Sequence, residues 1–240
     1  MTHKSNKFIP SSKKDDGMLS KVVLDVYDYL QDNYFRFLPD NCDFHLSSNC
    51  ISYMTIRSAM TSNGIPHNVA EKYYGLDSSI VPDSPIIYLS FFDGHARKLN
   101  PLFIGEIKKQ GTNDRRLSEG KKKQAIGNAA PDRVAKNYTI AADYCRHANG
   151  GFFPYTVFLY GCDFSDEGIT NTTKSKLLPF FGSFNTVNPF FDENVKWALK
   201  GGSCFYQGER FGEKELFDII LSVCREGLRY FFPEKFWHVR

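Results

Sequence analysis

Three short apolar runs constrain the fold of this chain more than any other feature, because each has the length and composition of a β-strand. They cover Ile86–Phe92, Leu102–Ile107 and Tyr155–Tyr160. The second and third runs are apolar almost throughout, which is typical of central strands covered on both faces. Segments with helical spacing alternate with the runs. The chain is therefore expected to fold as an α/β domain, with a central mixed β-sheet flanked by helices.

The helices are predicted from apolar residues that recur every three or four positions. Asp15–Asp16 offers an N-cap for the first of them. The expected helices are Met18–Phe37, Ile51–Ser62, Asn68–Tyr74, Pro131–His147 and Lys214–Phe231.

The connections carry their own signals. Asp93–Gly94 favours a turn, so the first two strands are predicted to form a hairpin with a long loop. Phe181–Asn194 is rich in glycine and asparagine and is expected to be loop, whereas Ser203–Gln207 is expected to be a short strand.

Length and composition suit one large domain, predicted over residues 18–240, because 42% of the 240 residues are hydrophobic. Residues 1–17 are polar and rich in lysine. They are predicted to be a mobile basic arm, which is either simply frayed or grips phosphate groups. The net charge of +3 is too small to indicate a nucleic-acid partner by itself.

The six cysteines form no C-x-x-C pair, so a structural zinc site is not expected. Met1–Ser20 has no secretory signal, and the thiols are therefore expected to be reduced in a cytoplasmic protein. The longest apolar runs are too short to span a membrane.

One segment places two opposite charges at the end of a buried strand. Glu106 and Lys108 lie two positions apart, so on a strand they point to the same side while Ile107 points into the core. Asp83 precedes the first strand, and the predicted hairpin brings it next to Glu106. Two carboxylates can bind Mg²⁺, and a lysine beside them can orient or deprotonate an attacking water. This set predicts hydrolysis of a phosphodiester.

Chance also produces such a triplet. With 24% charged residues, an E-x-K triplet is expected about once in a chain of this length, and Glu119-Gly120-Lys121 is a second example. That triplet follows no apolar run, whereas Glu106 ends a strand and has Pro82-Asp83 upstream. The alternative interpretation of Glu106 and Lys108 is a half-exposed salt bridge at a strand end.

Several segments, taken in order, resemble the EcoRI and MunI restriction endonucleases. Glu106–Gly111 is similar to the catalytic strand of that family. The other similar segments are Gly127–Ala129 with Asp132-Arg133 and Lys136-Asn137, then Phe153–Leu159 with Gly161, then Tyr206–Gly208 with the Leu216–Leu228 helix. The likeness runs from about Pro82 to Tyr230, and nothing before Ile80 contributes to it.

The resemblance implies a PD-(D/E)xK, restriction-endonuclease-like fold and a type II restriction endonuclease. It implies a cytoplasmic homodimer of the bacterial type, which cuts double-stranded DNA at a short palindrome and leaves 5′-phosphate and 3′-hydroxyl ends. Asp83, Glu106 and the backbone carbonyl of Ile107 are then the ligands of Mg²⁺, and Asp83, Glu106 and Lys108 are the catalytic residues. The rival functions are a repair or structure-selective nuclease of the same fold and a catalytically silent DNA-binding protein. The intact set argues against silence.

Two segments are predicted to contact DNA. The polar segment Gly111–Gln124 forms either a solvated face or a wall that binds phosphates. Its cationic residues are Arg115, Arg116, Lys121, Lys122 and Lys123. The base-reading residues are expected to be Asn128, Ala129, Ala130, Asp132 and Arg133. The alternative for this second segment is a helix cap in which Asp132 satisfies amides and pairs with Arg133, and both roles can hold at once.

The chain departs from the EcoRI pattern in this region. It has one more residue between Gly-Asn-Ala and the acid–arginine pair, its acid is aspartate rather than glutamate, and Phe184–Asn188 contains no arginine. The resemblance therefore predicts the reaction better than the recognised sequence. We expect an A/T-rich centre read by Asn128, and outer base pairs that differ from those of GAATTC or are not read.

Overall fold

The computed structural model describes residues 12–48, 50–73, 79–109, 129–149, 152–160, 181–183, 197–199, 204–208 and 212–236. Within these residues, seven strands form one sheet in the order β1-β2-β3-β4-β7-β6-β5. The strands are β1 (Cys42–Ser47), β2 (Ile86–Phe92), β3 (Arg97–Lys109), β4 (Tyr155–Tyr160), β5 (Phe181–Ser183), β6 (Trp197–Leu199) and β7 (Cys204–Gly208).

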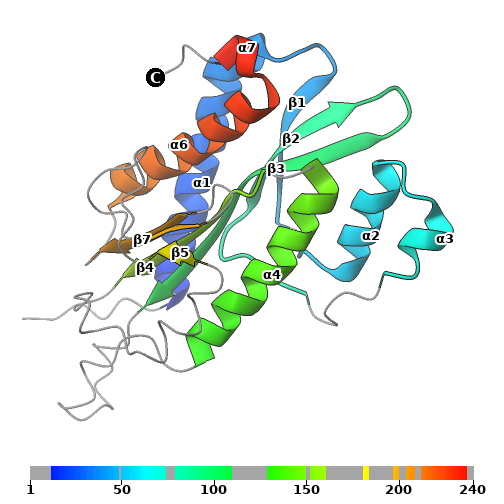
Figure 1. The fold of residues 1–240 in the computed structure, drawn as a ribbon. Helices are drawn as coiled ribbons and strands as arrows, with labels where there is room; N and C mark the ends of the chain where they lie inside the picture. The colour runs from blue at the N-terminus through cyan, green and yellow to red at the C-terminus, as the bar shows by residue number, and fades with distance from the viewer. Residues whose placement is uncertain are drawn as a thin grey trace, which may run out of the picture.

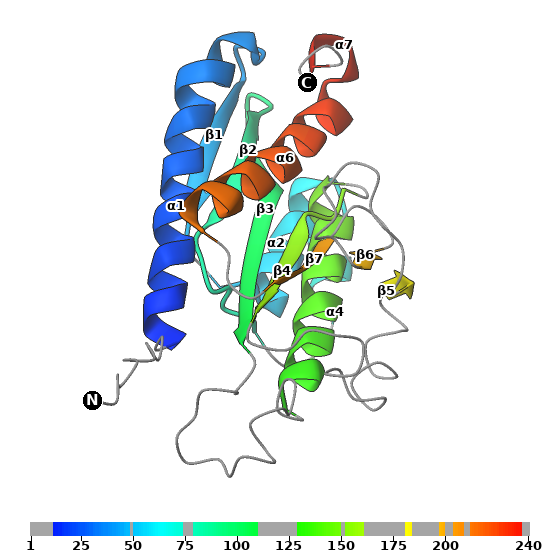
Figure 2. The same ribbon diagram turned by 90° about the vertical axis from the view of Figure 1, so that its left-hand side faces the viewer.

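The sheet is mixed, as the sequence predicts. β1, β2 and β3 pair antiparallel, β3, β4 and β7 pair parallel, and β5 and β6 continue from β7 antiparallel. Parallel neighbours need a crossover, and helix α4 (Ala129–Asn149) provides it between β3 and β4. The crossover sets the C-terminal end of β3 and the N-terminal end of α4 at the same end of the molecule (Figure 2).

Helices cover both faces of the sheet (Figure 1). One face carries α1 (Ser12–Tyr34), the 3₁₀ turn η1 (Phe35–Phe37), α6 (Glu213–Phe231) and α7 (Pro233–Phe236). The other face carries α4 together with α2 (Tyr53–Ser62), beside which lies α3 (His67–Ala70). No helix among these described residues is long and apolar enough to cross a membrane.

The two covered faces form two apolar cores. In the first, Leu19, Val23 and Leu30 of α1 meet Leu216 and Ile220 of α6 over the sheet. In the second, the side chains of α2 and α4 pack on the opposite face, where Ile104 of β3 and Val157 of β4 lie. β3 supplies residues to both cores because successive side chains on a strand alternate between faces. It is therefore a central strand buried on both sides.

Several predicted elements have different bounds in the structure. Helix α1 begins at Ser12 rather than Met18, α4 spans Ala129–Asn149 rather than Pro131–His147, and the helix predicted near Asn68–Tyr74 is only the four-residue α3. The prediction for Phe181–Asn194 as loop is wrong at β5, and β1 and β6 were not predicted. β5 and β6 have three residues each, which are too few to show a period, whereas the six residues of β1 alternate apolar Cys42, Phe44 and Leu46 with polar neighbours, a signal that the prediction missed.

The β2–β3 hairpin has a short connection, so the predicted long loop is wrong. β3 extends back to Arg97, which leaves only Asp93–Ala96 between the strands. The carboxylate of Asp93 accepts hydrogen bonds from the amides of His95 and Ala96, at 3.1 and 2.9 Å. Gly94 adopts a φ of 91°, which glycine tolerates best.

Candidate active site

The segment that carries Asp83 runs along one edge of β3, at the point where β2 has not yet begun. The amide of Asp83 donates to the carbonyl of Gly105 at 3.1 Å. The side-chain oxygen Oδ2 of Asp83 accepts from the amide of Ile107 at 2.8 Å. The carboxylate thus occupies the position that a neighbouring strand's carbonyl would take. The carboxylate is therefore held at the C-terminal half of β3, beside Ile107, which directly follows Glu106.

Gly105 makes this close approach of Asp83 possible. A Cβ at position 105 would lie 2.6 Å from the ring of Phe103 and 2.9 Å from Oγ of Ser84. Any larger residue would therefore have to displace the buried Phe103 ring or the segment that carries Asp83. On the other side of that segment, the hydroxyl of Ser20 in α1 donates to the carbonyl of Asp83 at 3.4 Å.

The carboxylate of Glu106 is buried on the α4 face of the sheet, with only 3% of the residue exposed. The side-chain nitrogen Nδ2 of Asn137, on α4, donates to Oε1 of Glu106 at 2.7 Å. The hydroxyl of Tyr155, the first residue of β4, donates to Oε2. Burial of a carboxylate is costly unless donors compensate it, and these two donors approach different oxygens of the same group.

Tyr155 is fixed as a donor. Its residue is 1% exposed, and its ring stacks on Phe153 at 5.9 Å and meets Tyr138 edge-on at 6.2 Å. Burial raises the pKa of Tyr155 well above the ordinary value, and the negative charges of Glu106 and Asp83 raise it further. The hydroxyl therefore keeps its proton and can donate a hydrogen bond to Oε2 of Glu106.

The two carboxylates of Asp83 and Glu106, with the backbone carbonyl of Ile107, are hard oxygen donors of the kind that fits a cation such as Mg²⁺. Carboxylates and backbone carbonyls are the protein ligands that this ion prefers, and it usually keeps several waters. No group of three or more His, Cys, Asp and Glu side chains suited to a metal occurs among the described residues. A site built from Asp83, Glu106 and the carbonyl of Ile107 has only two such side chains, so this absence is compatible with it.

The structure places only part of the predicted site. Lys108 lies within β3, two positions after Glu106, but its side chain is outside the described residues. Ala129, Ala130, Asp132 and Arg133 lie in the first turns of α4, and their side chains are likewise not described. The remaining predicted DNA contacts fall wholly outside the described residues: Arg115, Arg116, Lys121, Lys122, Lys123 and Asn128.

The salt-bridge interpretation requires Glu106 to be half-exposed. This prediction is wrong, because the residue is almost fully buried. Sequence reasoning also missed the parts that Asn137 and Tyr155 play. Asn137 offers a signal: it precedes Ala141, Tyr144 and Ala148, which are buried at helical spacing. A polar residue in line with an apolar stripe indicates that the helix meets a polar group there.

A mixed sheet flanked by helices is consistent with the class of restriction-endonuclease-like folds. A family model described as restriction endonuclease EcoRI matches residues 3–180, which is more than half of the 240-residue chain. The chain belongs to the EcoRI family of type II restriction endonucleases. This family binds DNA and generally uses a divalent metal ion.

The family match and the predicted resemblance differ in extent. The match begins at residue 3, so the N-terminal part belongs to the likeness although its sequence showed no motif before Ile80. It ends at residue 180, short of the predicted limit at Tyr230. A search of curated proteins found no match.

Proposed function

We propose that this chain is a Mg²⁺-dependent endonuclease that hydrolyses duplex DNA at a short palindromic site and leaves 5′-phosphate ends. The observation that carries the proposal is the pair of carboxylates at the end of β3, where Asp83 accepts from the amide of Ile107 and Glu106 is buried beside it. Two acids brought together by segments that are distant in sequence favour a catalytic role over a structural one.

The roles follow from the chemistry of each group. Asp83, Glu106 and the carbonyl of Ile107 would hold the cation. When bound, Mg²⁺ offsets the negative charge that develops on the phosphate and makes water a better nucleophile. Lys108 is assigned to the attacking water, which its amine orients or deprotonates. The same ammonium group offsets charge on the phosphate oxygens.

DNA is proposed to lie across the end of the molecule where β3 ends and α4 begins. The N-terminal end of a helix carries partial positive charge, which favours a nearby phosphate. Arg115, Arg116 and Lys121–Lys123 are assigned to phosphates, and Asn128–Arg133 to base edges in the major groove. Residues 18–240 are proposed to form the catalytic domain, with residues 1–17 as a basic extension whose last part, from Ser12, begins α1. A cytoplasmic location accompanies this function.

A palindromic site offers two equivalent scissile phosphates, so a two-fold symmetric homodimer is proposed to match them. Its interface should bury at least ~1,200 Å² in total, as stable interfaces do. Light scattering of the protein–DNA complex measures the assembly. A complex that holds a single protein chain would contradict the dimer.

Plasmid cleavage with Mg²⁺, followed by sequencing of the fragment ends, tests the reaction and the site together. Discrete fragments with 5′-phosphates support restriction. Nicking confined to mismatches or branches would instead indicate a repair nuclease, and binding without cutting would indicate a silent binder. End sequences confined to GAATTC would refute our expectation for the outer base pairs, and a G/C-only centre would refute the role of Asn128.

Lys108→Ala is the sharpest variant for the assigned chemistry. Cleavage should be lost while specific binding in a gel shift persists, because the lysine serves the water rather than the bases. Lys121→Ala, in the second E-x-K triplet, is the matched comparison. It should instead weaken binding and flatten the salt dependence by about one unit of slope. Near-normal cutting by Lys108→Ala would remove this lysine from the mechanism.

A further inference from the structure

The carboxylate of Glu106 is fixed by two donors that come from different parts of the fold. Asn137 belongs to α4 and donates to Oε1 at 2.7 Å, and Tyr155 belongs to β4 and donates to Oε2. A carboxylate can rotate about its terminal bond, but one donor on each oxygen restrains that rotation. The pair therefore sets the plane of the carboxylate as well as its position.

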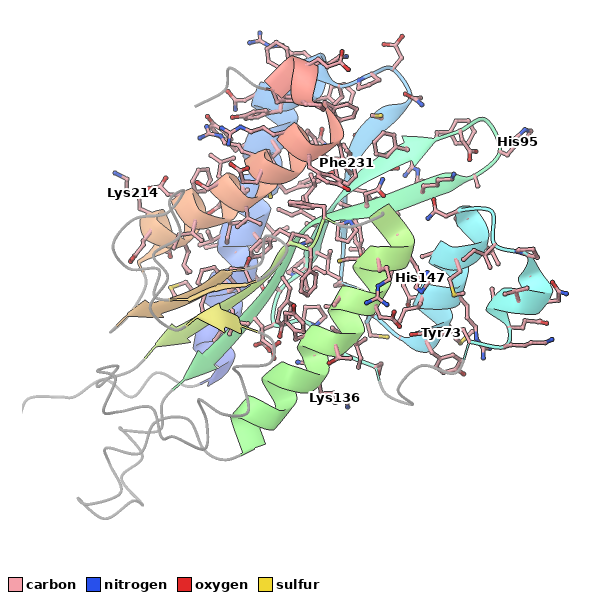
Figure 3. The ribbon with its side chains drawn as sticks, viewed as in Figure 1. Tyr73, His95, Lys136, His147, Lys214 and Phe231 are labelled. Carbon is pink, nitrogen blue, oxygen red and sulfur yellow. The ribbon has the colours of Figure 1, made fainter. Side chains whose placement is uncertain are left out.

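The two donors have supports of different kinds. Tyr155 lies in the parallel partner strand, where it pairs with Ile104 in register, and its ring contacts the rings of Phe153 and Tyr138. The position of Asn137 depends on how α4 packs against the sheet. Lys136, the residue before it on this helix, is labelled in Figure 3. One restraint thus comes from the sheet and the other from the crossover helix.

Partners of this kind around a metal ligand have a known physical effect. A carboxylate that binds a cation is commonly held by hydrogen bonds from a second layer of residues, and these orient it and tune its affinity. An oxygen that accepts one hydrogen bond can still accept a further partner, because it has two lone pairs. The observed bonds are therefore compatible with a cation at the same carboxylate.

We propose that Tyr155 and Asn137 are positioning residues, which hold Glu106 in the orientation that a divalent cation requires. The inference rests on the proposed nuclease function, because it assigns Glu106 to the cation. Neither residue is proposed to touch DNA or the reacting atoms. Both act through the carboxylate of Glu106, so their loss should weaken the response to the metal more than the binding of DNA.

Tyr155→Phe is the most selective change, since it removes one hydroxyl and keeps the ring packing. Its matched control is Tyr88→Phe. Tyr88 is another buried strand tyrosine, 3% exposed, and it is not one of the two donors described for Glu106, which are Asn137 and Tyr155. Asn137→Asp is a second, nearly isosteric variant that replaces the donor to Glu106 with an acceptor.

Two measurements separate positioning from general destabilisation. The first is the single-turnover rate of plasmid cleavage as a function of Mg²⁺ concentration. The second is binding of Mn²⁺ to the protein, followed by electron paramagnetic resonance, which needs no cleavage. Both variants should lose about 10–100-fold in metal affinity or in cleavage rate. Their dissociation constants for DNA should change by less than about threefold. In the Tyr88→Phe control, the metal affinity and the cleavage rate should also change by less than about threefold. Raising the Mg²⁺ concentration should partly restore the rate of Tyr155→Phe.

Wild-type metal dependence in Tyr155→Phe or Asn137→Asp overturns the proposal, and so does an equal loss in Tyr155→Phe and Tyr88→Phe. If Tyr155→Phe does not fold, the metal dependence of Asn137→Asp by itself decides whether the proposal holds. If the wild type cuts no DNA but binds Mn²⁺ through Glu106, weaker binding by the variants supports the positioning while the nuclease function fails. If the wild type neither cuts nor binds Mn²⁺, both proposals fail.

Discussion

The two ends of the β2–β3 hairpin hold acidic residues in opposite ways. At the tip, marked by His95 in Figure 3, Asp93 is exposed and accepts from two backbone amides of its own turn. At the base, Asp83 accepts from an amide of β3, and Glu106 is buried under α4. Asp93 lies 3.5 Å from the ammonium of Lys98, whereas Glu106 accepts hydrogen bonds from Asn137 and from Tyr155.

The contrast separates an acid held within its own turn from acids that distant segments bring together. These partners of Asp93 are all local, and together they explain the tight turn without further assumption. The acids at the base are brought together by residues distant in sequence: 24 positions separate Asp83 from Ile107, and 49 separate Glu106 from Tyr155. Such a long-range assembly of two acids supports the function proposed for them above.

The largest expected effect comes from removing the charges at the base. Asp83→Asn and Glu106→Gln should each abolish Mg²⁺-dependent cleavage of plasmid, because each removes a proposed ligand charge. DNA binding without metal should be retained or become tighter, since two carboxylates near a phosphate repel it. Gel shift and single-turnover cleavage measure the two effects separately.

Asp93→Asn is the matched control for these two variants. It makes the same acid-to-amide change in the same hairpin and should leave cleavage at the wild-type rate. If Asp83→Asn still cleaves, the upstream ligand is wrong, and another aspartate that precedes β2 in the sequence, Asp77, becomes the next candidate. Loss of cleavage in Asp93→Asn alone would reverse the comparison between tip and base.

The sequence predicts the local parts of this arrangement and misses the long-range ones. Periodicity and composition suffice for β2, β3, β4, α1, α4 and α6, which are long or strongly apolar. The hairpin places Asp83 near Glu106 as predicted, although the carboxylate meets β3 by a side-chain bond rather than through strand pairing. The burial of Glu106 and its bonds to Asn137 and Tyr155 depend on where the crossover helix is seated. The apolar stripe in line with Asn137 indicates that α4 meets a polar group, but it does not indicate which one.

The second prediction uses the two glycines of the hairpin. Gly105→Ala should destabilise the fold by about 1–3 kcal/mol, as overpacking does, because its Cβ would meet the ring of Phe103 at 2.6 Å. It should also slow cleavage, since relief of the overlap moves the segment that carries Asp83. Urea unfolding and single-turnover cleavage give the two values.

Gly94→Ala is the control at the tip. A Cβ at position 94 would meet no atom within 4 Å, so only the φ of 91° is strained. The cost should be about 1–2 kcal/mol, the usual penalty for a side chain in the left-handed region, with no change in the cleavage rate. Equal losses of cleavage in the two variants would mean that Gly105 acts through stability alone.

The smallest expected effect is the pH-dependent contribution of the Asp93 charge, at the tip, to the stability of the fold. Hydrogen bonds from the amides of Ala96 and His95 hold the pKa of Asp93 below its ordinary value of 3.8, and Lys98 lowers it further. A lowered pKa in the folded state stabilises the fold above the unfolded value, and that contribution disappears as the pH falls through the folded-state pKa. Asp93→Asn keeps an acceptor oxygen for the two amides and removes only the charge.

The variant Asp93→Asn should therefore be slightly less stable than the wild type at neutral pH, and the difference should shrink below pH 3.8. Added salt should reduce the difference at neutral pH as well, because the pair with Lys98 is solvent-exposed and is screened. Urea unfolding midpoints across this pH range measure it. A difference that persists unchanged in acid would show that the charge of Asp93 is not what stabilises the turn, and the amide bonds alone would then distinguish the tip from the base.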